Sequence, residues 1–282
     1  MLSMPAFQTL LEAWVAAPTL VAIRATELVF AWSLTIQTLE YLRMRPFTAD
    51  DGFWSWQLQR ADIPNAPLRA LLDVLFMPRV HQLHLVLRLL AAGVLAVQGA
   101  SLPLMLFLFV GNLLILIRWR GAFNGGSDFL TLVVLTGLLI SQVVGALGNP
   151  ELGWQAGFWY IAIQAITSYF LSGSVKVLRR EWRNGSAMTI FLNGAIYGPL
   201  SAHHPLRNKW LALIGSWSFI VWEMLFPLSL LDPRLAVVFC AVAAVFHFLV
   251  FWFFGLNRFF WAWMCSFPAI IWCSAQFSAR FV

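Results

Sequence analysis

Charged residues are scarce in this chain of 282 residues. They make up only 11% of it, whereas ordinary soluble domains carry about 25%. Hydrophobic residues make up 61%, and the mean hydropathy is +0.78. The 25 Phe and 15 Trp exceed what the core of a soluble domain of this length would need. The composition therefore excludes a water-soluble protein and predicts a polytopic membrane protein that forms one domain over 1–282.

Cysteine is also rare, with three residues in the chain. Cys265 and Cys273 fall on one predicted helix, about 12 Å apart at a rise of about 1.5 Å per residue. A disulfide needs Cα atoms within about 7 Å of each other, so these two cannot form one. Cys240 belongs to a different hydrophobic segment. We expect all three cysteines to be small packing residues.

Several sequence motifs of soluble enzymes are missing. The chain has no P-loop, no dinucleotide-binding glycine pattern, no nucleophile elbow and no internal repeat. His203 and His204 are adjacent, but no carboxylate or cysteine is spaced to complete a metal site with them. We therefore expect a surface histidine pair and no bound metal.

The first 18 residues are not expected to form a cleavable signal. They contain Glu12 and lack a basic start before an apolar core. Their large apolar residues predict an amphipathic helix over 1–18 that lies against the membrane.

Long continuous apolar runs dominate the rest of the sequence. A membrane-spanning helix needs about 20 apolar residues, and continuous rather than alternating runs exclude a β-barrel. We predict an all-α helical bundle with about eight spans, at 19–42, 81–99, 101–117, 129–147, 154–178, 210–231, 235–255 and 259–279. The second and third spans, and the sixth and seventh, are close enough to form hairpins.

Two polar stretches, 43–80 and 179–209, interrupt the pattern and are predicted to lie outside the membrane. Each is expected to contain a short amphipathic surface helix, at Ala66–Met77 and Ala187–Tyr197.

The basic residues are distributed unequally between the two membrane faces. We name the face where the first span begins face A and the opposite one face B. Face A receives Arg234 and Arg280, whereas Arg24 and Arg88 lie inside spans. Face B receives the remaining 14 basic residues: Arg43, Arg45, Arg60, Arg69, Arg79, Arg118, Arg120, Lys176, Arg179, Arg180, Arg183, Arg207, Lys209 and Arg258.

This bias predicts a multi-pass protein of the cell membrane with face B cytoplasmic and both termini extracytoplasmic. The pI of about 9.8 thus reflects topology and does not indicate nucleic-acid binding. The basic face is also suited to anionic lipid.

Ionisable residues inside the spans are the strongest functional signal, because each is costly in lipid and needs a partner or a cavity. In the half near face A, helical rise places Arg24, Glu27, Glu223 and His247 at similar depths. They could form one polar cluster. The alternatives are a structural ion pair of Arg24 with Glu27 or Glu223, and a plain hydrogen bond between helices for His247. For Glu223 we predict Arg24 or His247 as the partner.

A second cluster is predicted near face B, from Arg88, Lys176 and Asp128. Lys176 could instead extend to the surface, as lysines near helix ends do. Asp128 could instead only cap a helix.

Helical spacing aligns Tyr169, Gly173 and Lys176 in one stripe. The glycine allows a close approach, either by a ligand or by a neighbouring helix. If the stripe lines a pocket, Lys176 should point towards Asp128 or Arg88.

One segment resembles a known family. It contains Ser172-Gly173-Ser-Val-Lys176, followed by Trp182-Arg-Asn-Gly185. The pattern is similar to the signature of HTTM proteins, the horizontally transferred transmembrane domain related to the membrane domain of vitamin K-dependent gamma-carboxylases. Weaker pieces, in order along nearly the whole chain, are Asp51-Gly52, Leu71–Arg79, Asn124–Asp128, Phe246-His247 and Gly255–Phe259.

The resemblance implies a role for Lys176. In the carboxylases, the matching lysine is associated with deprotonation of vitamin K hydroquinone. A desolvated lysine is suited to such a role. Three differences from the carboxylases are expected. Ser127 precedes Asp128 where they carry a histidine, the sequence to Val282 is expected to lack their large extramembrane domain, and its charge bias predicts Lys176 at the opposite face.

Two functions are compatible with the sequence. The first is an HTTM-type membrane protein with an intramembrane polar pocket that helps to mature, export or shield a peptide or membrane partner. The second is a quinone- or lipid-dependent membrane enzyme with Lys176 as base and a quinone or reduced vitamin K as cofactor. A transporter is weaker, because the spans lack inverted repetition.

The expected partners are membrane lipid and a peptide or small protein, and not nucleic acid. The candidate catalytic residues are Lys176, His247 and Asp128. The remaining pocket residues are Arg24, Glu27, Arg88, Glu223, Tyr169, Gly173 and Trp182.

Overall fold

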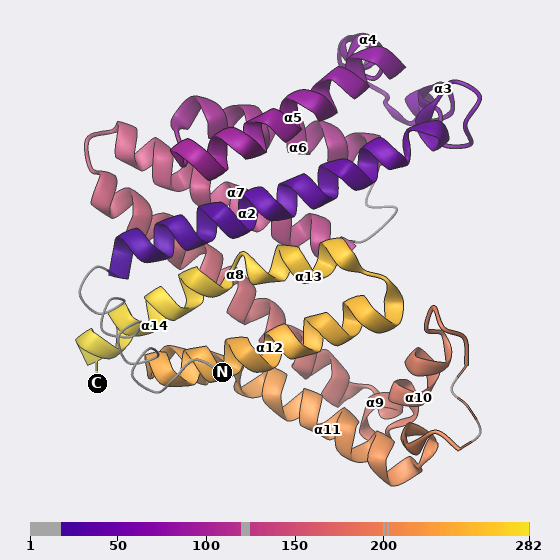
Figure 1. Cartoon of the computed structure of the whole chain (residues 1–282), viewed down its shortest axis with the longest axis vertical. Helices are drawn as coiled ribbons and strands as arrows, with labels where there is room; N and C mark the ends of the chain where they lie inside the picture. Colours follow the sequence, from indigo (N-terminus) through magenta and orange to yellow (C-terminus); the bar gives the residue numbers. More distant parts are fainter. Residues whose placement is uncertain (1–17, 120–124, 200, 202, 282) are drawn as a thin grey trace.

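A computed structural model describes residues 18–119, 125–199, 201 and 203–281, and this part of the chain is helical without a strand. The helices form the expected all-α bundle (Figure 1). Seven of the described helices are long and apolar enough to cross a membrane. They are α2 (Pro18–Arg43), α5 (Pro78–Gln98), α6 (Leu102–Trp119), α7 (Gly125–Ala146), α8 (Pro150–Leu178), α11 (Lys209–Leu225, continued by the 3-10 turn Phe226–Leu230) and α12 (Pro233–Phe254). The chain is thus a multi-pass membrane protein.

The predicted eighth span, 259–279, is not one helix. It consists of α13 (Asn257–Met264) and α14 (Phe267–Phe281), which follow one another between α2 and α12 (Figure 1). Pro268 explains the break, because its ring has no N–H to donate and would clash with the carbonyl of Met264. At the break, the backbone N–H and the hydroxyl of Ser266 both donate to the carbonyl of Trp263, at 3.1 and 2.8 Å. Such local bonds are how proline is tolerated inside membrane helices.

Small residues bring α7 and α8 into close contact. Gly153 and Gly157 are four residues apart on α8, and they face Gly137 and Ser141 of α7. A Cβ atom on Gly157 would lie 2.0 Å from the Ser141 hydroxyl oxygen and 2.4 Å from the Gly137 carbonyl oxygen. This spacing is the small-xxx-small pattern that allows membrane helices to pack backbone to backbone.

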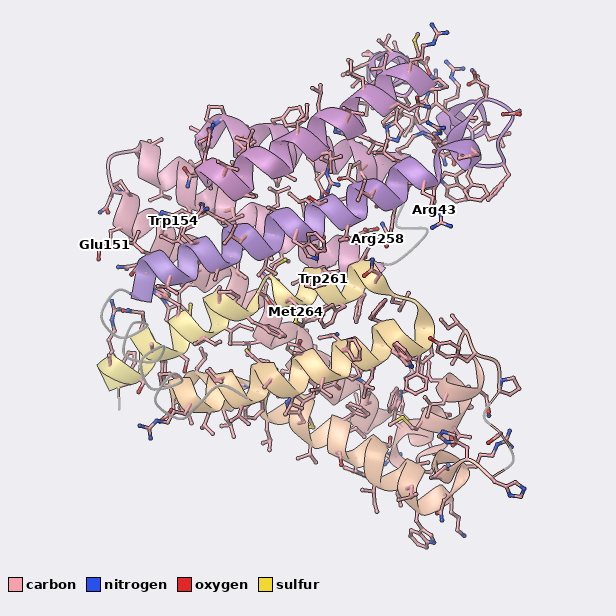
Figure 2. All side chains as sticks on the ribbon, in the orientation of Figure 1. Arg43, Glu151, Trp154, Arg258, Trp261 and Met264 are labelled. Carbon is pink, nitrogen blue, oxygen red and sulfur yellow. The ribbon has the colours of Figure 1, made fainter. Side chains whose placement is uncertain are left out.

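The polar segments gather at one end of the bundle. The short helices α3 (Trp56–Gln59), α4 (Ala66–Leu75), α9 (Arg180–Arg183) and α10 (Ser186–Asn193) lie opposite the C-terminus (Figure 1). Arg43 and Arg258 lie towards that end, which is face B, whereas Glu151 lies at the other (Figure 2). The two surface helices occur where they were predicted but end earlier, at Leu75 and Asn193. The predicted amphipathic helix over 1–18 falls outside the described residues except for Pro18, which begins α2.

Arg118 attaches the segment 43–80 to the bundle, and a surface ion pair holds parts of that segment together. The Arg118 guanidinium of α6 donates to the carbonyls of Thr48 and Trp54, at 3.0 and 2.8 Å. On the surface, Asp73 of α4 accepts two hydrogen bonds from Arg60, at 2.9 and 2.6 Å, and one from the Trp56 indole. These donors, Arg60 first, lower the pKa of the Asp73 carboxyl to about 2.

Candidate functional site

Lys176 lies in the last turn of α8, where its ammonium forms an ion pair with Glu223 of α11. The Nζ atom is 2.6 and 2.5 Å from the two carboxylate oxygens of Glu223 and 2.7 Å from the Ser172 hydroxyl. Only 14% of the lysine side chain and 3% of the glutamate side chain are exposed. The Ser172 hydroxyl also contacts the carboxylate at 3.2 Å. Thus Lys176 does not extend into water but serves an internal partner.

Gly173 allows α8 and α11 to approach closely enough for this pair. A Cβ atom on Gly173 would lie 2.9 Å from the Cβ of Glu223 and 2.9 Å from the backbone nitrogen of Met224. The space beside the glycine is therefore occupied by α11. Of the two interpretations of Ser172-Gly173, the structure supports close helix packing.

Trp182 covers the pair from the side of face B. Its ring centroid is 5.1 Å from the Lys176 Nζ, within the range of a cation–π contact. The carbonyl of Trp182 accepts the Ser216 hydroxyl of α11 at 2.5 Å. Further along, Gly185 adopts φ of 79° and lies against the backbone of Leu213. The antiparallel contact between α8 and α11 thus continues through α9.

Two predicted partners are wrong. Glu223 pairs with Lys176 and not with Arg24 or His247, and Lys176 points inward but not towards Asp128 or Arg88. The physical reason is helix arrangement. Arg88 lies on α5, which packs against α2 and α6, whereas α8 packs against α7, α11 and α14. Asp128 does lie on α7, but its carboxylate faces Gln37 of α2 and Arg258 of α13. The predicted depths were wrong as well, because Glu223 was placed in the half near face A and Lys176 near face B, yet the two side chains meet. Depth counted along a helix also does not determine which helices are neighbours.

Tyr169 and His247 form a separate contact deeper in the bundle. The Tyr169 hydroxyl is 2.7 Å from the His247 Nε2 atom, and both side chains are buried. The tyrosine ring stacks on Phe226 at 4.0 Å between centroids, and the histidine ring stacks on Trp263 at 4.8 Å. Among the described residues, His247 Nδ1 has no hydrogen-bond partner. This is a tightly packed aromatic contact between α8, α12 and α13, and it corresponds to the predicted alternative of a hydrogen bond between helices.

Arg24 and Glu27 of α2 form hydrogen bonds with the backbone at the turn between α5 and α6. Arg24 contacts Glu27 at 2.6 Å and donates to the carbonyl of Ala96 at 2.7 Å. Glu27 accepts the backbone N–H of Ala100 at 2.7 Å, beside Gly99, whose φ is 84°. The single predicted cluster near face A therefore does not form. Arg24 and Glu27 form the structural ion pair that was its alternative.

A buried network near face B contains Arg88 and Asp128 but not Lys176. Arg88 is fully buried and donates to Thr38 at 2.7 Å and to the side-chain oxygen of Gln37. The Gln37 amide lies 3.4 Å from Asp128, which is also 3.8 Å from the Arg258 guanidinium. The predicted association of Arg88 with Asp128 is thus present through Gln37.

Sequence reasoning missed several members of this network. Arg258 was counted only as a basic residue of face B, but it is buried and pairs with Glu40 at 2.9 Å. Its guanidinium carbon also lies 4.9 Å from the Tyr41 ring centroid. A signal was available, because Gln37, Glu40 and Tyr41 recur at three- and four-residue spacing inside an apolar run, which places them on one helix face.

The Lys176 ammonium has no free hydrogen-bond donor in its contact with Glu223 and Ser172. A lysine ammonium has three donors, and here the Ser172 hydroxyl and both carboxylate oxygens accept them. For Lys176 to bind a substrate group, or to accept a proton, the contact with Glu223 must first open. Among the described residues there is no group of three or more His, Cys, Asp or Glu side chains that could hold a metal ion.

No protein-family model, curated protein or solved structure matches this chain.

Proposed function

We propose that this membrane protein is of the HTTM type and that its Lys176–Glu223 pair recognises a membrane-resident peptide or partner, which the protein helps to mature, export or shield. The observation that carries the proposal is the burial of a charged pair in an otherwise apolar contact between two spanning helices. Ionisable residues at such positions are expensive and are found mainly where a function needs them.

The residues of the proposed family signature support this view, because they meet in one structural unit. Ser172 and Lys176 contact the Glu223 carboxylate, and Gly173 packs against the backbone of α11. Trp182 covers the ammonium, and Gly185 continues the contact with α11. These residues thus belong to one contact of α8 and α9 with α11, and that contact encloses the ion pair.

Exchange of partners is the simplest mechanism for such a pair. A carboxylate or another acceptor of an incoming molecule would replace Glu223 at the Lys176 ammonium. Because Lys176 lies in the last turn of α8 under Trp182, that molecule would approach from the face B end of α8.

A quinone- or lipid-dependent enzyme is the second candidate. The inward orientation of Lys176 favours it, since a base needs a site protected from bulk water. It also requires opening of the same ion pair, so the two candidates differ in the molecule that enters and not in the site.

Site-specific photo-crosslinking in native membranes would separate these candidates. We expect that benzophenone-alanine in place of Trp182 captures a peptide. Capture should fall about tenfold in the Lys176→Met/Glu223→Met background, since a charged hydrogen bond contributes about 1.5–3 kcal/mol. The matched control is the same substitution at Trp252, an exposed tryptophan of α12, where the double variant should change nothing.

The identity of the captured molecule decides between the candidates. A quinone or lipid adduct at position 182 would replace the peptide function with the enzymatic one. Equal capture with and without the charged pair would contradict both.

We also propose the orientation indicated by the basic residues, with face B cytoplasmic. The clustering of α3, α4, α9 and α10 at one end of the bundle supports a common face for the basic segments that contain them, and the charge bias then makes that face cytoplasmic. Reporter fusions after residue 65 and after residue 195 should report a cytoplasmic location, and a fusion at Val282 an extracytoplasmic one. A cytoplasmic reporter at Val282 would contradict this topology.

A further inference from the structure

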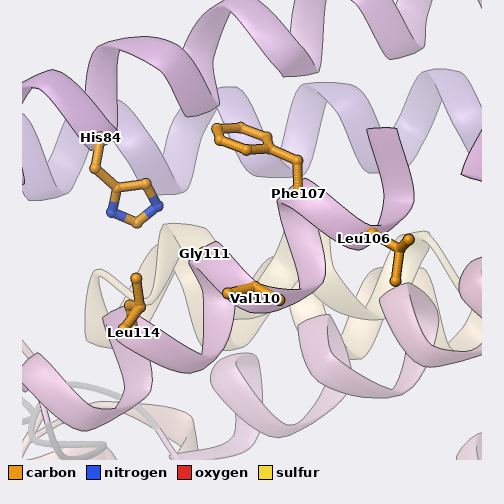
Figure 3. A pocket seen from close by; sticks show the side chains of 6 residues that line it. All are labelled: His84, Leu106, Phe107, Val110, Gly111 and Leu114. Carbon is orange, nitrogen blue, oxygen red and sulfur yellow. The ribbon is translucent and has the colours of Figure 1, made fainter. Parts of the chain in front are cut away.

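A groove on the lipid-facing side of α5 and α6 contains one polar side chain. It has a volume of about 330 Å³ and is lined by His84, Leu106, Phe107, Val110, Gly111 and Leu114 (Figure 3). Leu106, Phe107 and Val110 are exposed apolar residues of a spanning helix, so the groove opens towards the hydrocarbon of the bilayer. Only molecules dissolved in the membrane can reach it from that side.

His84 reaches the floor of this groove because Gly111 has no side chain. A Cβ atom on Gly111 would lie 2.5 Å from the His84 Nε2 atom. That nitrogen is buried against Gly111 and has no hydrogen-bond partner among the described residues, so the ring must turn towards the groove for a ligand to reach it. Its neighbour His81, with ring centroids 6.1 Å apart, is buried with both nitrogens unpartnered. Unpartnered polar atoms in an apolar environment are costly, and a ligand that supplies a hydrogen bond removes that cost.

The groove restricts the chemistry of such a ligand. A charged headgroup would be desolvated against leucine and valine walls, so the ligand is neutral. A neutral imidazole offers one donor and one acceptor, and a hydroxyl group can complement either. The volume lies near the lower end of ordinary ligand pockets, about 300–1,000 Å³, which suits a single chain. His84 is about 9 Å along α5 from its first residue, so the polar end of the ligand would lie inside the face B half of the bilayer.

We propose that the α5–α6 groove is a binding site for a neutral single-chain amphiphile whose hydroxyl group hydrogen-bonds to His84. The site is independent of the Lys176–Glu223 pair, because it lies on other helices.

Photolabelling in lipid nanodiscs tests this site. The probe is a long-chain primary alcohol with an aliphatic diazirine in its chain, and labelled peptides are mapped by mass spectrometry. Labelling of residues 106–114 is compared with labelling of the exposed face of α12 in the same sample. We expect His84→Leu, which keeps the groove apolar and filled, to lower this ratio about fivefold. His84→Gln, which restores a hydrogen-bonding group, should recover part of it.

Two further measurements keep the result interpretable. Gly111→Ala keeps the histidine but places a Cβ atom 2.5 Å from its Nε2 atom, which moves the imidazole off the groove floor, and should lower the ratio as His84→Leu does. Each variant must retain the thermal unfolding midpoint of the unmodified protein to within a few degrees. An unchanged ratio in a folded His84→Leu variant would show that the groove holds only ordinary surrounding lipid and would overturn the proposal.

Discussion

Lys176→Met should lower the free energy of unfolding by about 3–5 kcal/mol, the usual loss when one partner of a buried ion pair is removed. The variant leaves the Glu223 carboxylate, 3% exposed, with the Ser172 hydroxyl at 3.2 Å as its remaining hydrogen bond. The loss is thus mainly the desolvation of a stranded charge rather than the strength of the original pair. Denaturant titration of the detergent-solubilised protein measures this loss of stability.

The double variant Lys176→Met/Glu223→Met separates stability from function. With both charges replaced by apolar side chains, stability should return close to that of the unmodified protein, because an apolar pair of similar volume is often as stable as a buried ion pair. Arg179→Met is the control, since Arg179 is exposed and a surface change should stay within about 0.5 kcal/mol. A double variant as unstable as Lys176→Met would show that the stranded carboxylate is not the cause.

The same double variant also tests the purpose of the pair. If it folds but no longer captures a partner at position 182, the pair serves recognition. If it folds and captures normally, the pair is only structural and the proposed function fails.

Gly157→Ala should separate α7 from α8 and lower the free energy of unfolding by about 3 kcal/mol, at the upper end of the usual cost of overpacking. Its new Cβ atom would lie 2.4 Å from the Gly137 carbonyl oxygen, a backbone atom that cannot rotate away. The contact can be relieved only by moving one helix. Unfolding measurements in the same detergent would detect the loss.

Gly93→Ala is the matched control, because a Cβ atom on this helical glycine of α5 meets nothing within 4 Å. There alanine should be neutral or stabilising by up to about 1 kcal/mol, since it is the better helix former. Adding Ser141→Gly to Gly157→Ala should recover only part of the loss, because it removes the hydroxyl contact at 2.0 Å but not the carbonyl contact. Equal effects at Gly157 and Gly93 would contradict backbone-to-backbone packing of α7 and α8.

Hydropathy alone determined the class of this protein and the positions of most of its spanning helices. A segment in lipid must satisfy its own backbone hydrogen bonds and present apolar side chains, so its sequence must be apolar over the whole crossing. The Arg24–Glu27 pair could be predicted from the sequence for a similar local reason, since three-residue spacing places both residues on one helix face. The break between α13 and α14 at Pro268 also has a local cause, but the apolar run around it is continuous and predicted a single span.

The pairing of Lys176 with Glu223 was decided by the tertiary structure. The two residues are 47 positions apart, and helical rise had assigned them to opposite halves of the membrane. The choice depends on which helices touch, and that depends on where small residues allow close approach. Gly173 brings α11 against α8, whereas the glycines of α7 and α8 hold that pair together. Sequence therefore shows which charges lie within apolar spans, and helix packing determines which charges are buried and which of them meet.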